Sequence, residues 1–80
     1  MVIIVISPQE IANRIKAVCK SKSIAVSKML VDLGLNHSAI TVLQYRGTYP
    51  RLDVLYRIAE YLDVSIDFLV GRTENEKVNL

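Results

Sequence analysis

The side chains best suited to hydrogen bonding with a ligand lie in the middle of the chain, between residues 36 and 51. Helical spacing of the apolar residues leaves one side of residues 36–46 polar. On that side His37, Ser38 and Thr41 offer donors and acceptors, and Val42 offers methyl groups. These groups complement the edges of nucleic-acid bases, with Val42 placed for a thymine methyl group. We therefore expect His37, Ser38, Thr41 and Val42 to contact bases.

A second set of donors follows and would suit phosphate groups. Arginine, tyrosine, threonine and amide side chains commonly bind phosphate oxygens, which positions a protein on DNA without reading its sequence. Asn36 is expected at the start of a helix, where the exposed backbone amides carry the positive end of the helix dipole. Asn36 and these amides would bind a phosphate together. The expected phosphate contacts are Asn36, Gln44, Tyr45, Arg46, Thr48, Tyr49 and Arg51.

Alternatives remain open in this region. His37 has a second interpretation as a solvated residue at a helix start, because a lone histidine carries no chemistry by itself. Tyr49 has a second interpretation as a packed loop anchor. No arginine or lysine occurs from residue 36 to 45, so the bidentate arginine–guanine contact is not available in the first turns of this segment.

No residue pattern in the sequence indicates a catalytic site. The chain has one histidine and one cysteine, with no glycine-rich phosphate loop and no carboxylate pair on a shared face. Too few ligands lie close together for a metal site. We expect no enzyme activity, no metal, no cofactor and no small-molecule ligand.

Cysteine content and hydropathy indicate the compartment. The single Cys19 cannot form an internal disulfide and fits a buried residue in the reducing cytosol. The apolar run at residues 2–6 is too short for a signal peptide or a membrane span. We expect a cytoplasmic protein without a membrane partner.

Five helices are predicted from capping residues and apolar periodicity. Ser7, Pro8 and Glu10 form a capping box with proline in the first helical position, and this helix should end near residues 20–22. Further helices are expected from about residue 25 to 33, from 36 to 46, from 52 to 62, and in a short segment after Ser65 that ends at Gly71. The predicted core residues are Ile11, Ile15, Val18, Cys19, Met29, Leu30, Leu33, Ala39, Ile40, Leu43, Leu55, Ile58, Ala59, Leu62, Ile66, Leu69 and Val70.

Gly34 separates the second and third of these segments. Only a tight turn fits between them, and two short helices that cross over such a turn form a helix-turn-helix, whose second helix can lie in the DNA major groove. The chain is thus expected to be all-α, with a helix-turn-helix domain at residues 7–71. Asn36 is the expected N-cap of the third helix, which Gly47 should end.

Charge is divided unequally along the chain. Residues 1–52 carry seven basic and two acidic side chains, a net charge of +5, and residues 53–80 carry three basic and six acidic ones, a net charge of −3. The basic part contains the helix-turn-helix, which suits a polyanionic partner. The alternative is that these charges only solvate helix surfaces.

The two ends of the chain differ from the helical domain. Residues 1–6 are expected to form an extended apolar segment, which would either lie over the core or pair with the same segment of a second molecule. Pairing is favoured, because a lone hydrophobic edge would invite aggregation. Tyr56, Tyr61 and Phe68 belong to the core or to a competing dimer surface on the last helices. Residues 72–80 are predicted to be a polar tail.

The residues from 11 to 73 resemble the Cro and lambda-repressor-like, or xenobiotic-response-element type, helix-turn-helix regulators. The similarity is strongest over residues 52–73, with their alanine, valine–serine and leucine–glycine pattern, and it includes Gly34 and Ile40. The resemblance implies a five-helix lambda-repressor-like fold and a small DNA-binding regulator, often a dimeric repressor, of bacterial, phage or mobile-element type.

The chain departs from that family at defined positions. Ala25 and Val26 replace a threonine–glutamine pair that opens the second helix in many members, and Leu30 replaces a small alanine. One extra residue lies between Ile40 and Gly47, and a shorter loop before Pro50 compensates for it. The last turn of the third helix is therefore expected to differ from that of the family.

Two functions follow from these observations. The first is a sequence-specific, homodimeric binder of double-stranded DNA that regulates transcription, as a repressor of phage or mobile-element type. The alternative is a non-catalytic protein-interaction module, such as an antitoxin or anti-repressor, on the same fold. The apolar N-terminal segment and the uncharged third helix motivate that alternative.

Overall fold

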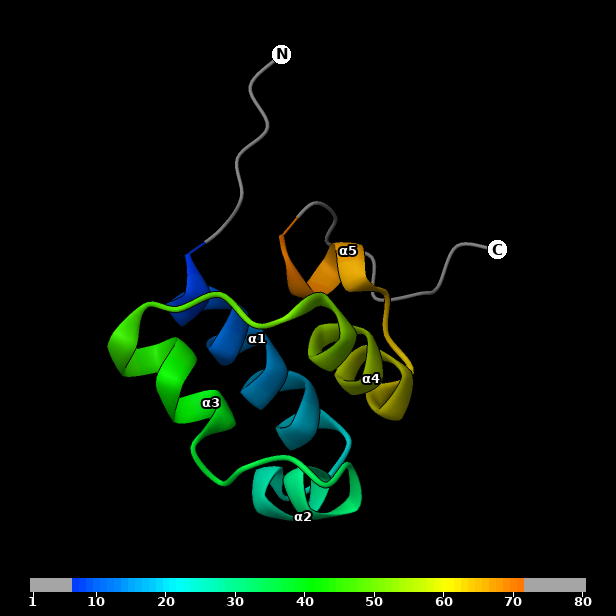
Figure 1. The fold of residues 1–80 in the computed structure, drawn as a ribbon. Helices are drawn as coiled ribbons and strands as arrows, with labels where there is room; N and C mark the ends of the chain where they lie inside the picture. The colour runs from blue at the N-terminus through cyan, green and yellow to red at the C-terminus, as the bar shows by residue number, and fades with distance from the viewer. Residues whose placement is uncertain (1–6, 72–80) are drawn as a thin grey trace.

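The computed structural model describes residues 7–71, which form an all-α domain (Figure 1). The predictions for residues 1–6 and 72–80 lie outside this range. The described elements are α1 (Pro8–Ser21), α2 (Val26–Asp32), α3 (Ala39–Thr41), the π-helical segment η1 (Val42–Arg46), α4 (Leu52–Leu62) and α5 (Ile66–Leu69). None of these helices is long and apolar enough to span a membrane.

The helix starts follow from side-chain caps. The Glu10 N–H donates to Ser7 Oγ at 3.3 Å and Pro8 is the first residue of α1, as the capping box predicts. The Phe68 N–H donates to Ser65 Oγ at 3.0 Å, which confirms Ser65 as the cap of α5. Ala25 precedes α2 without a side-chain cap. The predicted bounds of α4 are those observed.

One core joins all the helices. Its buried residues include Ile11, Ile15, Met29, Ile58 and Leu69, each no more than 1% exposed. Most predicted core residues are buried, whereas Leu33, Ala39, Ile66 and Val70 are half-buried against the core. The pattern did not identify Ala12 and Val64, which are buried as well.

Three helices end in the same hydrogen-bonded motif. After α2, Leu35 N–H donates to Leu30 O at 2.8 Å and Gly34 N–H donates to Val31 O at 3.0 Å, with Gly34 at φ +68°. This is a Schellman turn, and it reverses the chain toward α3 as predicted. The same bonds end α1 and α4, where Ser23 and Asp63 take the left-handed conformation at φ +58° and +57°.

The third helix differs from the prediction at its start. It begins at Ala39 and not at Asn36. The Asn36 Oδ1 accepts hydrogen bonds from Ser38 N–H at 3.0 Å and Ser38 Oγ at 2.9 Å, and Ala39 N–H donates to Asn36 O at 3.0 Å. Asn36 therefore closes a local Asx turn before the helix, because its short amide competes with helical hydrogen bonding.

The end of the third helix is π-helical. Residues 42–46 form a π-helical turn that ends at Gly47, which is at φ +67°. A π-helical turn accommodates one more residue than an α-helical turn. Residues 42–46 thus fit one more residue into this turn than an α-helix would, while Ile40 and Leu43 stay buried.

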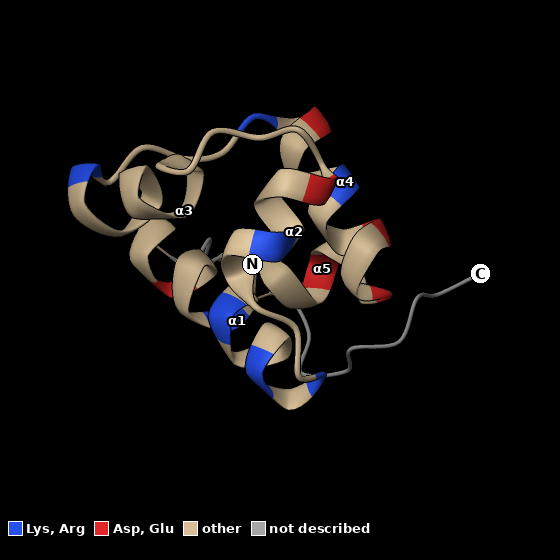
Figure 2. Ribbon diagram, turned by 90° about the horizontal axis from the view of Figure 1, so that it is seen from below, with Lys and Arg blue, Asp and Glu red and all other residues tan. Residues whose placement is uncertain are grey.

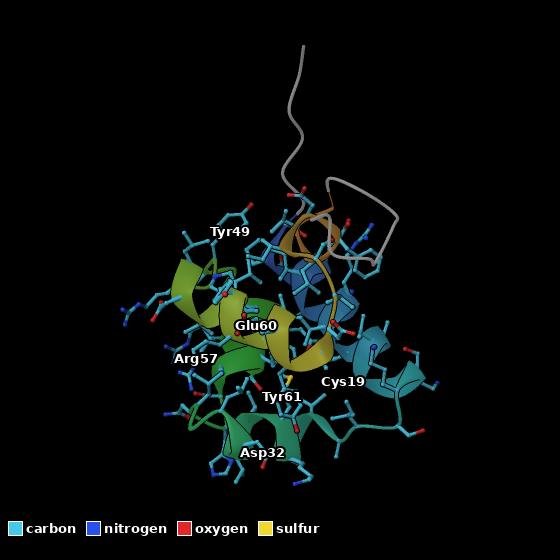
Figure 3. The ribbon with its side chains drawn as sticks, turned by 90° about the vertical axis from the view of Figure 1, so that its right-hand side faces the viewer. Cys19, Asp32, Tyr49, Arg57, Glu60 and Tyr61 are labelled. Atoms are coloured by element: carbon cyan, nitrogen blue, oxygen red, sulfur yellow. The ribbon has the colours of Figure 1, made fainter. Side chains whose placement is uncertain are left out.

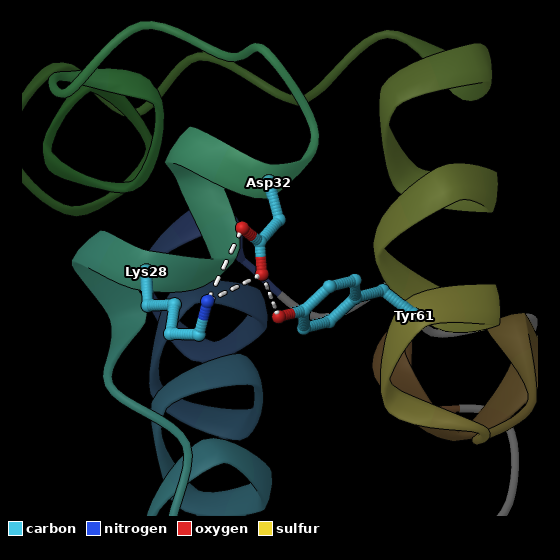
Figure 4. Close-up of polar contacts among 3 residues, drawn as sticks. All are labelled: Lys28, Asp32 and Tyr61. Carbon is cyan, nitrogen blue, oxygen red and sulfur yellow. Dashed lines mark hydrogen bonds and ion pairs between the residues drawn. The ribbon is translucent and has the colours of Figure 1, made fainter.

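Side-chain bonds hold the outer helices in place. Tyr61 of α4 donates to Asp32 Oδ2 at 2.6 Å, and Lys28 lies 3.3 Å from the same carboxylate (Figure 4). Arg57 of α4 donates to the Leu33 carbonyl at the end of α2. On the other side, Arg14 of α1 donates to the Phe68 carbonyl at 3.0 Å and its guanidinium lies 4.9 Å from the ring centroid. Tyr61 and Phe68 thus pack at the core, whereas Tyr56 is 50% exposed.

Candidate nucleic-acid interface

The candidate site is the outer face of α3 and η1. The inner face of this segment carries Ile40 and Leu43, which are buried against the core formed with α1. Burial of these two residues fixes the rotation of the helix and turns the intervening polar residues to solvent. His37, Ser38 and Thr41 are exposed, and Val42 is half-buried.

A shallow hollow lies on this outer face, lined by Ser38, Thr41, Val42, Tyr45 and Arg46. It unites three of the expected base contacts with two of the expected phosphate contacts. His37 and Asn36 are exposed but do not line it. The hollow therefore offers hydroxyl, methyl, phenol and guanidinium groups to one ligand surface.

Tyr45 and Arg46 owe their position to the π-helical turn. Its wider spacing places residues four and five apart on one side, so Thr41 is followed on the outer face by both Tyr45 and Arg46. Tyr45 is 76% exposed, and no part of the core covers it. A phenol and a cation are thereby held beside the polar residues of α3.

Gln44 lies differently from the other expected phosphate contacts. It is half-buried, and its Oε1 accepts a hydrogen bond from Lys16 Nζ of α1. Only the amide nitrogen of Gln44 remains as a donor for another partner. The sequence reasoning left Lys16 out of the site, and no local signal marks it because 28 residues separate Lys16 from Gln44.

The loop after η1 supplies the remaining candidates. Thr48, Tyr49 and Arg51 are all exposed. Arg51 Nε lies 3.3 Å from Asp53 Oδ1, with both side chains well exposed. Because this ion pair partly neutralises Arg51, Arg46 is the stronger cation of the two for a phosphate.

The charge division of the sequence reappears in space. Lysine and arginine lie along α1 and at the end of the third helix, and acidic residues gather on the side of α4 and α5 (Figure 2). Within residues 53–71 Arg57 is outnumbered by four acidic residues, Asp53, Glu60, Asp63 and Asp67. A polyanion would therefore be attracted to the side that carries α1 and α3.

Several titratable groups with shifted pKa lie in packing contacts. The hydrogen bond from Tyr61, and then that from Lys28, lowers the pKa of Asp32, and the same bond to Asp32 raises the pKa of Tyr61. Burial raises the pKa of the Cys19 thiol (Figure 3). Its Sγ lies 4.0 Å from Met29 Sδ. These pKa shifts thus arise from contacts between packed helices. Within residues 7–71, no cluster of three or more histidine, cysteine or carboxylate ligands could hold a metal ion.

These observations define an all-α domain with a helix-turn-helix formed by α2, the turn at Gly34 and α3. The chain is 31% identical over 67 residues to an uncharacterised HTH-type transcriptional regulator, YqaE, of Bacillus subtilis (strain 168). The aligned residues cover 84% of this chain and 58% of that protein, so the chain spans less than two thirds of the relative's length. No family model and no solved structure matches the chain. The similarity supports a helix-turn-helix relationship without indicating a particular type.

Proposed function

We propose that the chain binds double-stranded DNA through the outer face of α3 and η1 and regulates transcription without catalysis. The observation that carries this proposal is the hollow where Ser38, Thr41 and Val42 meet Tyr45 and Arg46. A protruding helix of this size fits a major groove, where residues near its start read base edges. The name of the Bacillus subtilis relative agrees with such a role.

The expected base contacts stay His37, Ser38, Thr41 and Val42. The Ser38 hydroxyl already contacts Asn36 Oδ1 at 2.9 Å, so its orientation is set before DNA arrives. Thr41 is exposed and lies beside Val42, a pairing that suits a base edge next to a thymine methyl group. Phosphate contacts from Asn36, Gln44, Tyr45, Arg46, Thr48, Tyr49 and Arg51 would flank them.

We propose further that the protein acts in the cytoplasm as a homodimeric repressor of the Cro and lambda-repressor-like type, from a phage or mobile element. A dimer would read two half-sites about one helical turn, roughly 34 Å, apart. Bound in this way, the protein would block access of other proteins to promoter DNA.

Selection from random duplexes at physiological salt tests the proposal. We expect enrichment of a site with two-fold symmetry. Thr41→Ala should then alter the preferred base at one position of each half-site, whereas Thr48→Ala should weaken binding to all sequences alike. Recovery of only weak, salt-labile complexes would contradict sequence-specific binding.

Arg46→Ala tests the phosphate assignment. It should lower affinity for preferred and random duplexes alike and reduce the slope of log affinity against log salt by about one unit. Arg51→Ala is the matched control and should have the smaller effect, because Asp53 already pairs with Arg51. Unchanged affinity of the Arg46 variant for both duplexes would refute the assignment.

The second candidate function is a non-catalytic protein-interaction module of the antitoxin or anti-repressor kind. The absence of lysine and arginine from residue 36 to 45 and the exposed Tyr45 favour it, since both suit a protein partner. The duplex selection separates the two functions, because this module would enrich no sequence.

A further inference from the structure

One flank of α1 carries a row of polar side chains. Gln9, Asn13, Lys16 and Lys20 follow one another at intervals of four, three and four residues, which places them on the same side of the helix. Lys16 is half-buried, and the other three are exposed. Each of the four side chains ends in an amide or an ammonium group. The flank therefore offers N–H donors along its whole length.

This flank lies against the third helix. The Lys16 Nζ donates a hydrogen bond to Gln44 Oε1, and a Cβ added at Gly47 would lie 3.5 Å from Gln9 Nε2. Figure 1 shows α1 and the third helix side by side, in agreement with the contacts between α1 and η1. The row of donors therefore borders the candidate nucleic-acid interface over about two helical turns.

The bond to Lys16 fixes the orientation of the Gln44 amide. An ammonium group only donates hydrogen bonds, so the amide oxygen must face Lys16 and the amide nitrogen is turned to the opposite side. Lys16 uses one of its three N–H donors in this bond and keeps two, and the Gln44 amide keeps both of its own. The pair thus combines several donors with one positive charge, which suits an anion that can accept several hydrogen bonds.

The charge of Lys16 is not neutralised inside the domain. Within residues 7–71 no carboxylate forms an ion pair with Lys16, whereas Lys28 pairs with Asp32 and Arg51 pairs with Asp53. A half-buried lysine can pack its apolar stem and still keep its ammonium group at the surface. Lys16 therefore keeps its full charge for an external anion.

We propose that Lys16 and Gln44 together bind one phosphate of the DNA backbone, beside the groove that receives α3. This inference rests on the proposed function and adds a contact from α1 to it. The phosphate oxygens would accept hydrogen bonds from the Lys16 ammonium group and from Gln44 Nε2, which Lys16 holds in position. Hydrogen bonds between charged groups are stronger than neutral ones, and phosphate contacts set the register of a protein on the duplex. Lys16 is thus a phosphate contact and also a positioning residue for Gln44.

The salt dependence of duplex binding tests this role of Lys16. Lys16→Met removes the charge and keeps the apolar stem. It should weaken binding to the selected duplex and to a random duplex alike, and the slope of log affinity against log salt should fall by about one unit, because one phosphate is no longer neutralised. Lys16→Arg keeps a positive charge and should retain the wild-type slope. Fluorescence-anisotropy titrations over a range of salt concentrations measure both quantities.

Lys22→Met is the matched control. Lys22 is an exposed lysine at the C-cap of α1, six residues beyond Lys16, so this variant loses the same charge from the same helix. Its slope should stay close to that of the wild type. Gln44→Met should weaken binding to both duplexes without changing the slope, because the lost donor is neutral. Circular dichroism should show that all of these variants keep their helices.

Two outcomes would overturn the role of Lys16 and leave the proposed function standing. A wild-type slope for Lys16→Met would show that Lys16 only connects α1 to η1, whatever its effect on stability. Equal decreases in slope for Lys16→Met and Lys22→Met would show a general effect of charge and no contact at Lys16. A wild-type chain that binds neither duplex would instead refute the proposed function and this contact together.

Discussion

The phenol of Tyr61 donates a 2.6 Å hydrogen bond to Asp32 Oδ2 and so connects α4 to α2, the first helix of the helix-turn-helix (Figure 4). Lys28 Nζ lies close to both oxygens of this carboxylate, 3.4 Å from Oδ1 and 3.3 Å from Oδ2. Arg57 binds the Leu33 carbonyl one residue further along. The end of α2, where the chain turns toward α3, is therefore fixed from α4.

Tyr61→Phe should destabilise the domain in a pH-dependent way. The hydrogen bond lowers the pKa of Asp32, so its contribution is present above the unfolded pKa, near 4, and is lost as pH falls through the lower folded value. The urea midpoint of the variant should thus lie below that of the wild type at pH 7, and the two should converge toward pH 3.

Tyr56→Phe provides the control for this experiment. It removes a bond of the same length to Glu60, but within one helix. Its urea midpoint should stay close to that of the wild type, because no second element is released. An equal loss for Tyr61→Phe at both pH values would show that the charge of Asp32 is not involved.

Ser23→Gly should stabilise the domain by roughly 1 kcal/mol in denaturant unfolding. Ser23 is at φ +58° in the turn after α1, a conformation that glycine adopts without strain. Ser27→Gly, inside α2, is the control and should destabilise by about 0.5 kcal/mol.

Gly34→Ala should change the free energy of unfolding in the opposite direction to Ser23→Gly. Nothing lies within 4 Å of an added Cβ at Gly34, so its left-handed backbone alone would make the change unfavourable, by about 1–2 kcal/mol. A neutral Gly34→Ala variant would mean that the turn readjusts.

Lys16 and Gln44 should be energetically coupled. Their side chains bond across α1 and η1, and a bond of this kind contributes about 1 kcal/mol net. Lys16→Met keeps the apolar stem, and Gln44→Met keeps the side-chain length. A double-mutant cycle of these two changes should give a coupling of about 0.5–1.5 kcal/mol, whereas additive effects would deny the contact a role in stability.

The π-helical turn of η1 should matter for binding more than for folding. In a variant that lacks Gln44 and carries an inserted glycine after Thr48, the third helix should return to α-helical geometry. Gln44→Ala is the length-matched control. The urea midpoint should be no lower than in the control, because the π-helical turn is gone, while affinity for the selected duplex falls as Tyr45 and Arg46 move. Equal affinities of this variant and the Gln44→Ala control for the duplex would exclude η1 from the DNA-binding surface of the protein.

Local signals explain why much of the fold was predictable. Ser7 and Ser65 cap the helices that follow them through bonds three residues along the chain, and the period of apolar residues in α4 fixes its buried face. The start of the third helix was wrong because Asn36 can cap a helix or close an Asx turn, and its neighbours in sequence do not decide between them.

The sequence by itself determined the order of the helices and the turn at Gly34, because these depend on backbone conformation and on side chains within a few positions. Only the tertiary structure decided that Lys16 binds Gln44, that Tyr61 binds Asp32, and that Ser38, Thr41 and Arg46 share one hollow. The first two depend on how α1 packs against η1 and how α4 packs against α2, and the hollow depends on the π-helical turn of η1. Contacts between residues 28 or 29 positions apart leave no periodic trace in either segment.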